Sequence, residues 1–496
     1  MSEPVEEQGA AATEGARTNY DRTPPPALLE FMTQGWEPVP GEAVSPISGL
    51  DLYQERRRRV AEMFPGQLLV VPSGVGRVRS NDTEYRFRPG TDYLYLVGDG
   101  EPDEVLVLEP QEGGGHLARL YCEPEADFTR SDFFTDRAKG VFWVGPRRGL
   151  RATASRFGLE ARPLAALPRV LGAHDRGAVL RGLDPAVDRL AADIAGPDEE
   201  FRARLSEMRL LKDQLEVDLL QEAVDLTVAA FRDVVRELPA SRSERDVEAV
   251  FFRRARTGGY DTGYPTIAAA GAHATILHWS HNTGELRPGE LLLLDAGVET
   301  QRFYTADVTR TLPINGRFSR EQRRVYELVW AAQQAGLAEV RPGNEFQAPN
   351  RAAQRVLARG LEDLGILPVS AEQALAPDSQ LHQRYTLHGV SHMLGLDVHD
   401  CAHAAQELYP KGQLAEGMVL TVEPGLYFQP HDGTVPAELR GIGVRIEDDV
   451  VVTADGCRVL SAGLPSRADE VEAWMAGVWG EGHNQVPGVA PGVAHG

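Results

Sequence analysis

The chain has 496 residues, 42% hydrophobic and 25% charged, which is ordinary globular usage and argues against a disordered or fibrous protein. The net charge of -22 argues against sequence-independent binding to nucleic acid or an anionic membrane, because both need clustered Lys and Arg. No apolar run approaches the ~20 residues of a membrane span, and the acidic N-terminus is unlike a signal peptide. Three cysteines without a CxxC spacing indicate neither a disulfide framework nor a zinc knuckle. We expect a cytoplasmic protein.

Both ends of the chain are predicted to be flexible tails. Residues 1–45 are rich in Glu, Ala, Thr and Pro and lack hydrophobic periodicity. Residues 471–496 end in a low-complexity stretch of Gly, Pro and Val. The remaining chain is expected to form two domains, over 46–195 and 196–470.

The pattern in residues 46–195 predicts a small α/β domain. A helix is expected over 52–64, with its four consecutive arginines, 56 to 59, on a solvated face. Strands are expected over 68–74, 92–98 and 103–110, because apolar β-branched and aromatic residues there end at Gly or Pro.

Residues 196–470 follow a different pattern. After a bridging stretch at 196–212, apolar residues recur at helical spacing near 220–231, 325–332 and 353–361. Strands are expected over 291–297, 303–314, 418–428 and 443–453. Helices mixed with antiparallel hairpins favour an α+β fold over a doubly wound parallel sheet.

Four acidic residues and a histidine lie near the ends of these apolar strands: Asp295, Asp307, His392, Glu423 and Glu447. A single Asp in such a place is more often a turn former or a salt-bridge partner. Strands this apolar are usually buried, however, and an uncompensated buried carboxylate is very costly. Something cationic is therefore expected to meet the four carboxylates.

The basic residues nearest in sequence, Arg310 and Arg445, could pair with one or two of the carboxylates but not with four. Two divalent cations would nearly balance the set. One imidazole among four carboxylates suits Mn²⁺, Mg²⁺ or Fe²⁺ better than Zn²⁺. Two such ions ~3.5–4 Å apart would bridge a water, lower its pKa and polarise a scissile carbonyl. The chemistry expected is hydrolysis without a covalent enzyme intermediate.

Four segments in the second domain resemble the signature segments of the proline-specific metallopeptidases with the pita-bread fold, and most closely aminopeptidase P of family M24. They are DAGVETQRFYTADVTRTLP, HGVSHMLGLDVHD, LTVEPGLYF and RGIGVRIEDDVVVT. The stretch RSNDTEYRFRPGTDYLYLVGDGEPDEVLVL (79–108) resembles the smaller domain of the same family. The resemblance spans roughly 50–465. It implies an aminopeptidase P-type N-terminal domain followed along the chain by a pita-bread catalytic domain.

The resemblance also implies roles for the five ligands. Asp295 would chelate one metal, expected to be Mn²⁺, whereas Asp307 and Glu447 would bridge the pair. His392 and Glu423 would complete the other site, with Glu423 also moving the proton of the attacking water. The implied reaction is attack by a metal-bridging hydroxide on peptides with proline in the second position.

Further residues around the ligands match family positions. His278, His388 and His399 would contact the substrate, and the last two would steady the developing oxyanion. Arg445 and Tyr427 resemble residues that orient the acidic ligands. The histidines could instead be surface residues, and Tyr427 could be a core aromatic. His388 and His392 share a face only if they lie on a helix.

Two departures from the family pattern fall in expected hairpin loops, which tolerate insertion. One extra residue lies between Asp295 and Asp307, and QPHDGTVPAELRG lengthens the segment before Glu447. Neither removes a ligand.

Several other functions compete with an Xaa-Pro aminopeptidase. Creatinase lacks the metal ligands, and methionine aminopeptidases lack the smaller domain. Prolidase, which cleaves Xaa-Pro dipeptides, shares the ligands and the domain plan and is the main alternative. A non-catalytic binding protein of this fold is disfavoured because no ligand is missing. The resemblance further implies a homodimer or homotetramer.

Overall fold

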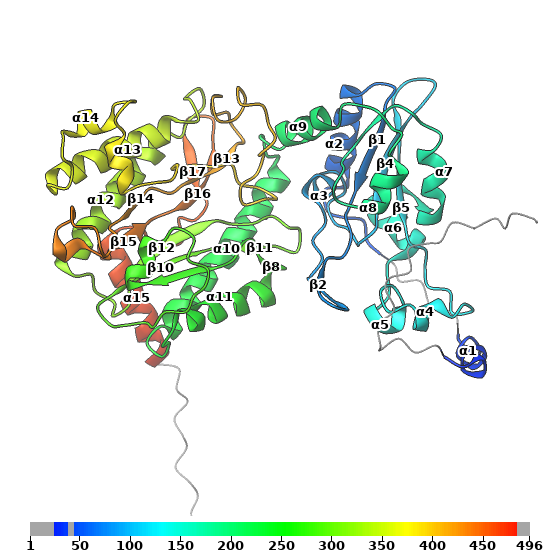
Figure 1. Cartoon of the computed structure of the whole chain (residues 1–496), viewed down its shortest axis with the longest axis horizontal. Coiled ribbons are helices and arrows are strands. Elements are labelled where there is room, and N and C mark those ends of the chain that lie inside the picture. Colours follow the sequence, from blue (N-terminus) through cyan, green and yellow to red (C-terminus); the bar gives the residue numbers. More distant parts are fainter. Residues whose placement is uncertain (1–23, 38–43, 484–496) are drawn as a thin grey trace, which may run out of the picture.

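The computed structural model describes residues 24–37 and 44–483, which form two lobes that follow one another along the chain (Figure 1). Most of the predicted N-terminal tail and the last part of the predicted C-terminal tail lie outside the described residues. None of the described helices is both long enough and apolar enough to cross a membrane.

The N-terminal lobe is built on a mixed five-stranded sheet in the order β6-β5-β4-β1-β7. The central strands pair antiparallel, whereas the outer pairs β1–β7 and β5–β6 are parallel. The strands of the whole lobe are β1 (Leu68–Pro72), β2 (Val78–Ser80), β3 (Thr83–Glu84), β4 (Val105–Pro110), β5 (His116–Cys122), β6 (Glu160–Pro163) and β7 (Gly177–Val179). Its helices are α1 (Pro26–Met32), α2 (Leu50–Met63), α3 (Thr91–Val97), α4 (Asp132–Thr135), α5 (Val141–Val144), α6 (Gly149–Phe157), α7 (Leu167–Leu171) and α8 (Pro185–Leu190).

The strand predicted over 92–98 is wrong, because this segment forms helix α3. All five residues from 93 to 97 are buried, so the run is apolar on every side and carries no helical period. A short apolar run of this kind cannot be assigned to strand or helix by periodicity alone. Gly98, with φ of +95°, ends the helix in the left-handed conformation that glycine adopts without strain.

The arginine run on α2 does not form the solvated face that the sequence predicts. Arg56 and Arg57 are buried, and they donate to the carbonyls of Tyr95 and Leu96 at the C-terminal end of α3. The negative end of the helix dipole favours cations there. Arg56 also pairs with Glu216 of the second lobe at 2.9 Å. These two arginines therefore join elements, and only the second half of the run faces solvent.

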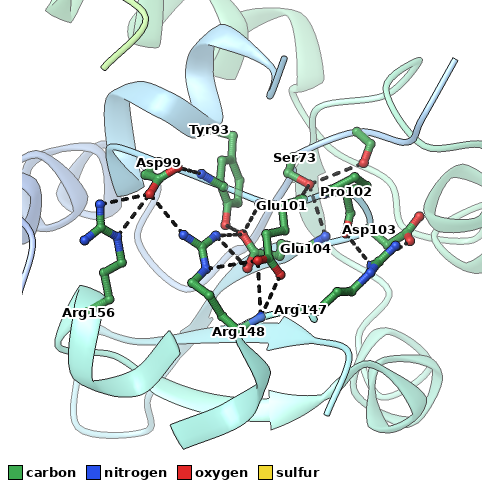
Figure 2. A network of polar contacts seen from close by, with 12 residues as sticks. Ser73, Tyr93, Asp99, Glu101, Pro102, Asp103, Glu104, Arg147, Arg148 and Arg156 are labelled. Atoms are coloured by element: carbon green, nitrogen blue, oxygen red, sulfur yellow. Dashed lines mark hydrogen bonds and ion pairs between the residues drawn. The ribbon is translucent and has the colours of Figure 1, made fainter. Parts of the chain in front are cut away.

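A buried carboxylate lies at the centre of a polar network in the N-terminal lobe (Figure 2). Glu104 is 1% exposed, and burial raises the pKa of its carboxyl, whereas the Arg148 cation opposes that rise. The carboxylate accepts the hydroxyl of Tyr93 at 2.7 Å and lies 3.2 Å from the Arg148 guanidinium. Arg148 in turn reaches Asp99 at 3.0 Å, and Arg156 shares that acceptor. The network ties α6 and the preceding loop to the sheet.

Replacing Arg148 by Met is expected to lower the free energy of unfolding of this lobe by about 3–5 kcal/mol, since it leaves the Glu104 carboxylate buried without a cation. Urea unfolding followed by circular dichroism measures the loss. The double variant Arg148→Met/Glu104→Gln should regain part of it, because the buried group is then neutral. The same change at the exposed Arg58 should have a much smaller effect, and equal losses at the two sites would contradict this account.

The second lobe is reached through α9 (Asp198–Met208), in the stretch predicted to bridge the domains, and contains the predicted helices. The strand expected over 303–314 is shorter than predicted, because only residues 308–313 form it. Its helices are α10 (Gln214–Glu237), α11 (Glu244–Gly258), α12 (Arg320–Leu337), α13 (Ala348–Asp363), α14 (Ala371–Leu375) and α15 (Ala468–His483). Its strands are β8 (Asp261–Thr262), β9 (Ile267–Ala270), β10 (Leu291–Ala296), β11 (Val298–Glu299), β12 (Val308–Pro313), β13 (Val419–Val422), β14 (Gly425–Tyr427), β15 (Gly443–Arg445), β16 (Asp448–Val452) and β17 (Cys457–Val459). Short 3-10 turns lie at Leu164–Ala166 in the N-terminal lobe and at Gly271–Thr275, Leu381–Arg384 and Ala437–Leu439 in the second lobe.

Small antiparallel sheets form the centre of this lobe, with the long helices outside them (Figure 1). One has the order β12-β10-β9, another β13-β16-β17, and β14 pairs with β15. Two strands expected to be continuous are interrupted: 418–428 divides into β13 and β14, and 443–453 into β15 and β16. Glu423 lies in the first break and Glu447 in the second. Each break turns a carboxylate out of the strand pairing and toward the same region.

The C-terminal segment is not the flexible tail that the sequence predicts at 471–496, because α15 extends through it to His483. Val471, Met475 and Val478 are buried and recur at spacings of four and three. This helical stripe is present in the sequence but is short and interrupted by Gly and Trp. At the other end of the chain, helix α1 lies within the predicted tail 1–45.

Candidate metal centre

A cavity of about 560 Å³ lies between the small sheets of the second lobe. Nine of the ten residues singled out from the sequence line it, namely His278, Asp295, Asp307, His388, His392, His399, Glu423, Arg445 and Glu447. The tenth, Tyr427, touches the lining through hydrogen bonds to two of these residues. The cavity wall also contains apolar side chains from Pro265, Ile267, Leu277 and Val398.

The first two carboxylates come from one hairpin. Asp295 is on β10 opposite Thr309 of β12, and Asp307 directly precedes β12. In the turn between them, Glu299 and Thr305 form an isolated bridge. Both carboxylates are buried. Both carboxylates therefore belong to one hairpin, whatever the length of its turn.

His392 lies on an extended loop and not on a helix, so its four-residue spacing from His388 does not place the two side chains on a common face. Backbone hydrogen bonds hold this loop along β13: Thr421 donates to the carbonyl of His392 at 3.0 Å, and Glu423 donates to that of Val390 at 2.8 Å. The His392 Nδ1 lies 3.1 Å from the carbonyl of Met393, which can only accept, so Nδ1 carries the proton. The other ring nitrogen, Nε2, faces the carboxylates of Asp307 and Glu423.

Ligand atoms converge closely at the centre of the cavity. Asp307, His392 and Glu447 each offer one atom, and these atoms lie within 4.8 Å of one another. The His392 Nε2 is 3.3 Å from Asp307 and 3.5 Å from Glu423. Asp295 completes the set through Tyr264, whose hydroxyl contacts both Asp295 and Asp307. The structure thus brings all five predicted ligands together.

The ionised carboxylates of this site repel one another. Burial raises the pKa of Glu423 to about 7, and burial together with the neighbouring carboxylates raises that of Glu447 well above its usual range. Burial alone would lower the pKa of His392, but Asp307 and Glu423 raise it to about 9. The Oε1 of Glu447 has no hydrogen-bond partner among the described residues. A buried acceptor without a donor, inside a group of repelling carboxylates, fits a bound cation.

Arg445 and Tyr427 form a chain that links the acidic ligands to His388. The Arg445 guanidinium bonds the carboxylate of Asp295 and donates to the Tyr427 hydroxyl at 2.9 Å. Tyr427 lies 2.7 Å from the His388 Nε2, and the His388 Nδ1 lies 2.8 Å from the carbonyl of Gly389. Since that carbonyl must accept, Nδ1 holds the proton and Tyr427 donates to Nε2. Burial, with the nearby Arg445 cation, lowers the pKa of His388 to about 4, so its ring is neutral.

The loop that presents His278 is held by a buried acid on α11. Glu244, at the helix N-terminus, accepts from the Trp279 indole at 2.8 Å and from the backbone of Gly284 at 2.6 Å. His273 also contacts it at 2.8 Å and stacks on Trp279 with ring centroids 3.9 Å apart. His278 itself is exposed at the cavity. Its ring is therefore free to meet a ligand, while its backbone is held by its neighbours.

Two residues of the site have no counterpart in the sequence predictions. Tyr264 stands just before β9, and nothing in its surroundings distinguishes it from a core aromatic. Asp449 is buried, accepts the N–H of Asp307 at 3.0 Å and has one oxygen without a partner among the described residues. It follows Glu447 by two residues, so strand alternation would have placed both on one face.

Comparisons with known proteins agree with this geometry. The family model of metallopeptidase family M24 matches residues 218–454, and that of the aminopeptidase P N-terminal domain matches residues 53–178. Xaa-Pro aminopeptidase 1 of Streptomyces coelicolor is 50% identical over 460 residues, covering 91% of this chain and 92% of that protein. The Xaa-Pro aminopeptidase of Escherichia coli is 32% identical over 87% of this chain and 99% of its own length.

A solved structure agrees as well. Aminopeptidase P from Escherichia coli with the inhibitor Pro-Leu superimposes with a TM-score of 0.78 at 31% identity, covering 88% of this chain and 99% of that one. The match confirms the predicted α+β architecture, with a pita-bread catalytic domain and a separate smaller N-terminal domain. It also confirms the resemblance to aminopeptidase P. The chain therefore belongs to metallopeptidase family M24 and carries the aminopeptidase P type of N-terminal domain.

Proposed function

We propose that this metallopeptidase releases the N-terminal residue from peptides with proline in the second position. The observation that carries the proposal is the convergence of the five predicted ligands on one cavity, in a chain whose relatives are named Xaa-Pro aminopeptidases. In this proposal two divalent ions are held by Asp295, Asp307, His392, Glu423 and Glu447. Such ions activate a water and polarise a scissile carbonyl when bound.

Within this site Glu423 is the residue proposed to accept the proton of the attacking water and return it to the leaving amine. Its carboxylate faces the cavity between His392, at 3.5 Å, and His388, at 3.4 Å. A carboxylate that faces the cavity between two imidazoles suits a group that takes up and releases a proton in each turnover. Asp307 and Glu447 are proposed to bridge the two ions, as the family resemblance implies, and their ligand atoms lie within 4.8 Å of one another and of His392.

The histidines are proposed to bind the substrate around this centre. His278 and His399 are exposed at the cavity, and His388 is half-buried beside Glu423. An imidazole that is free to donate, such as that of His399, would stabilise the oxyanion that develops at the scissile carbonyl. Both ring nitrogens of His388 are already hydrogen-bonded. Arg445 and Tyr427 would orient Asp295 and His388 through the hydrogen-bonded chain.

Proline in the second position makes the scissile amide tertiary, so it has no N–H to donate. A site that accepts it must recognise the ring by shape. Ile267, Leu277 and Val398 give the cavity an apolar wall for that purpose. Prolidase activity on Xaa-Pro dipeptides remains the alternative, and the identities to Xaa-Pro aminopeptidases favour the peptide substrate.

The deciding experiment uses the whole protein, stripped with a chelator and assayed with and without added Mn²⁺. Release of the N-terminal residue from an Xaa-Pro-Yaa tripeptide is expected only after Mn²⁺ is restored. An Xaa-Ala-Yaa tripeptide serves as the matched control and should remain intact. Cleavage of an Xaa-Pro dipeptide alone would make the protein a prolidase, and no cleavage of any peptide would favour the non-catalytic alternative.

We further propose Mn²⁺ as the native metal, because the ligand set has one imidazole and four carboxylates and no thiolate. A cytoplasmic location is supported by the three cysteines, which are all free in the described structure. Assembly into a homodimer or homotetramer stays a prediction from the family resemblance, as does the absence of nucleic acid and membrane partners.

A further inference from the structure

The ring of His399 is placed by its backbone and not by hydrogen bonds of its own. Within the described residues it accepts and donates none, and it meets His392 edge-on with ring centroids 4.4 Å apart. It lies on the loop 395–400, which we call the His399 loop. Its position in the cavity therefore depends on whatever holds this loop.

Residues of the N-terminal lobe hold the first half of the His399 loop. Arg88 donates to the carbonyl of Leu396 at 2.5 Å, and the Thr91 hydroxyl donates to the Asp397 carboxylate at 2.6 Å. Arg88 is itself anchored by Glu299, at 2.6 Å, which is buried on the hairpin of Asp295 and Asp307. One arginine thus joins the N-terminal lobe, the ligand hairpin and the His399 loop.

A second contact holds the other end of the loop. Asp400 is 2% exposed and accepts from Arg209 at 3.0 Å, and the same guanidinium bonds Asp92 in the first turn of α3. Asp400 also accepts the N–H of Cys401 at 2.7 Å. Cys401 has φ of +62°, a conformation that a residue with a side chain adopts only where its surroundings impose it. The contacts on Asp400 supply that constraint directly after His399.

We propose that Arg88, Thr91 and Asp92 are positioning residues that extend the catalytic apparatus into the N-terminal lobe, by fixing the His399 loop on both sides of His399. The proposal rests on the function proposed above for His399. A misplacement of ~1 Å can lower a rate about 100-fold even when it begins far from the chemistry. Because the oxyanion develops only in the transition state, loss of these contacts should lower kcat more than it raises KM.

The test compares Arg88→Ala with the wild type on the Xaa-Pro-Yaa tripeptide at saturating Mn²⁺. We expect kcat to fall at least ~10-fold while KM changes less than ~3-fold. The decisive readout is a double-mutant cycle: in a His399→Ala background, Arg88→Ala should have little further effect, because the residue through which it acts is gone. If the loss of kcat in the double variant equals the product of the two single losses, the proposal is overturned.

Two further variants control for general damage. Thr91→Val removes only the hydroxyl that bonds Asp397 and should lower kcat in the same direction by a smaller factor. Arg302→Ala breaks contacts between the lobes, with the Tyr53 hydroxyl at 2.6 Å and the Ser48 carbonyl at 3.3 Å, without touching the His399 loop. It should leave kcat within ~2-fold of the wild type. An equal loss in Arg302→Ala would mean that the contacts simply hold the lobes together.

Hydrogen exchange gives a readout that needs no substrate. Backbone amides of 394–402 should exchange faster in Arg88→Ala and Thr91→Val than in the wild type and in Arg302→Ala. Unchanged exchange in that segment would overturn the proposal whatever the kinetics show. If the wild type cleaves no peptide, the proposed function fails, while faster exchange would still show that the N-terminal lobe holds the loop.

Discussion

Glu423→Gln is expected to reduce turnover of an Xaa-Pro-Yaa tripeptide at least ~10³-fold, because general acid–base transfer alone contributes about 10²–10⁴-fold and the amide is also a weaker metal ligand. The change keeps the shape of the side chain and removes a carboxyl whose pKa is raised by desolvation. Folding should therefore be little affected. Steady-state kinetics, thermal unfolding and metal content measured on the same sample separate these effects.

Glu438→Gln is the matched control, since it makes the same chemical change at an exposed residue outside the cavity. Its kcat should equal that of the wild type. Near-normal rates in Glu423→Gln would remove Glu423 from the proton transfer. A lost rate in a variant that has also lost its metal would assign Glu423 to binding alone.

Asp307→Asn is expected to lower the bound metal from two ions per chain to one or none, with turnover lost in parallel. Asp307 belongs to the group of three residues whose ligand atoms lie within 4.8 Å, and it also contacts Tyr264 and His392. A neutral amide at a bridging position gives up both the charge and one of the two coordinating oxygens. Elemental analysis after dialysis against a defined Mn²⁺ concentration measures the stoichiometry.

Thermal unfolding adds an independent readout of Asp307→Asn. A ligand that binds only the folded state stabilises it by RT ln(1 + [L]/Kd), so added Mn²⁺ should raise the Tm of the wild type and raise that of the variant much less. Asp363→Asn, at an exposed position near the end of α13, should behave as the wild type. Retention of both ions in Asp307→Asn would exclude the bridging role.

Much of the site follows from local sequence. Four carboxylates and a histidine at the ends of apolar strands must be neutralised together when they are buried, whatever the order of the strands. The resemblance of four segments to the family then identifies which residue is expected to be each ligand. Helices α10, α12 and α13 were predictable for a similar reason, because each has one buried stripe at helical spacing.

Other features depend on contacts that no local pattern contains. Helix α3 is buried on every side, so its period is invisible in the sequence, and only its neighbours distinguish it from a strand. Arg56 and Arg57 look like surface residues until the end of α3 and the second lobe approach them. The breaks at Glu423 and Glu447 likewise interrupt sequences that would pair as continuous strands.

The residue types of the predicted metal ligands, the family and the two-domain plan are all readable from short stretches of the chain. The support of the site is not, because it depends on Tyr264 between two carboxylates and on Arg88 between the lobes. The two kinds of feature differ in the range of the interactions that produce them. Ligand identity and strand character are local properties of the chain, whereas a hydrogen bond such as that from Arg88 to Leu396 joins residues 308 positions apart.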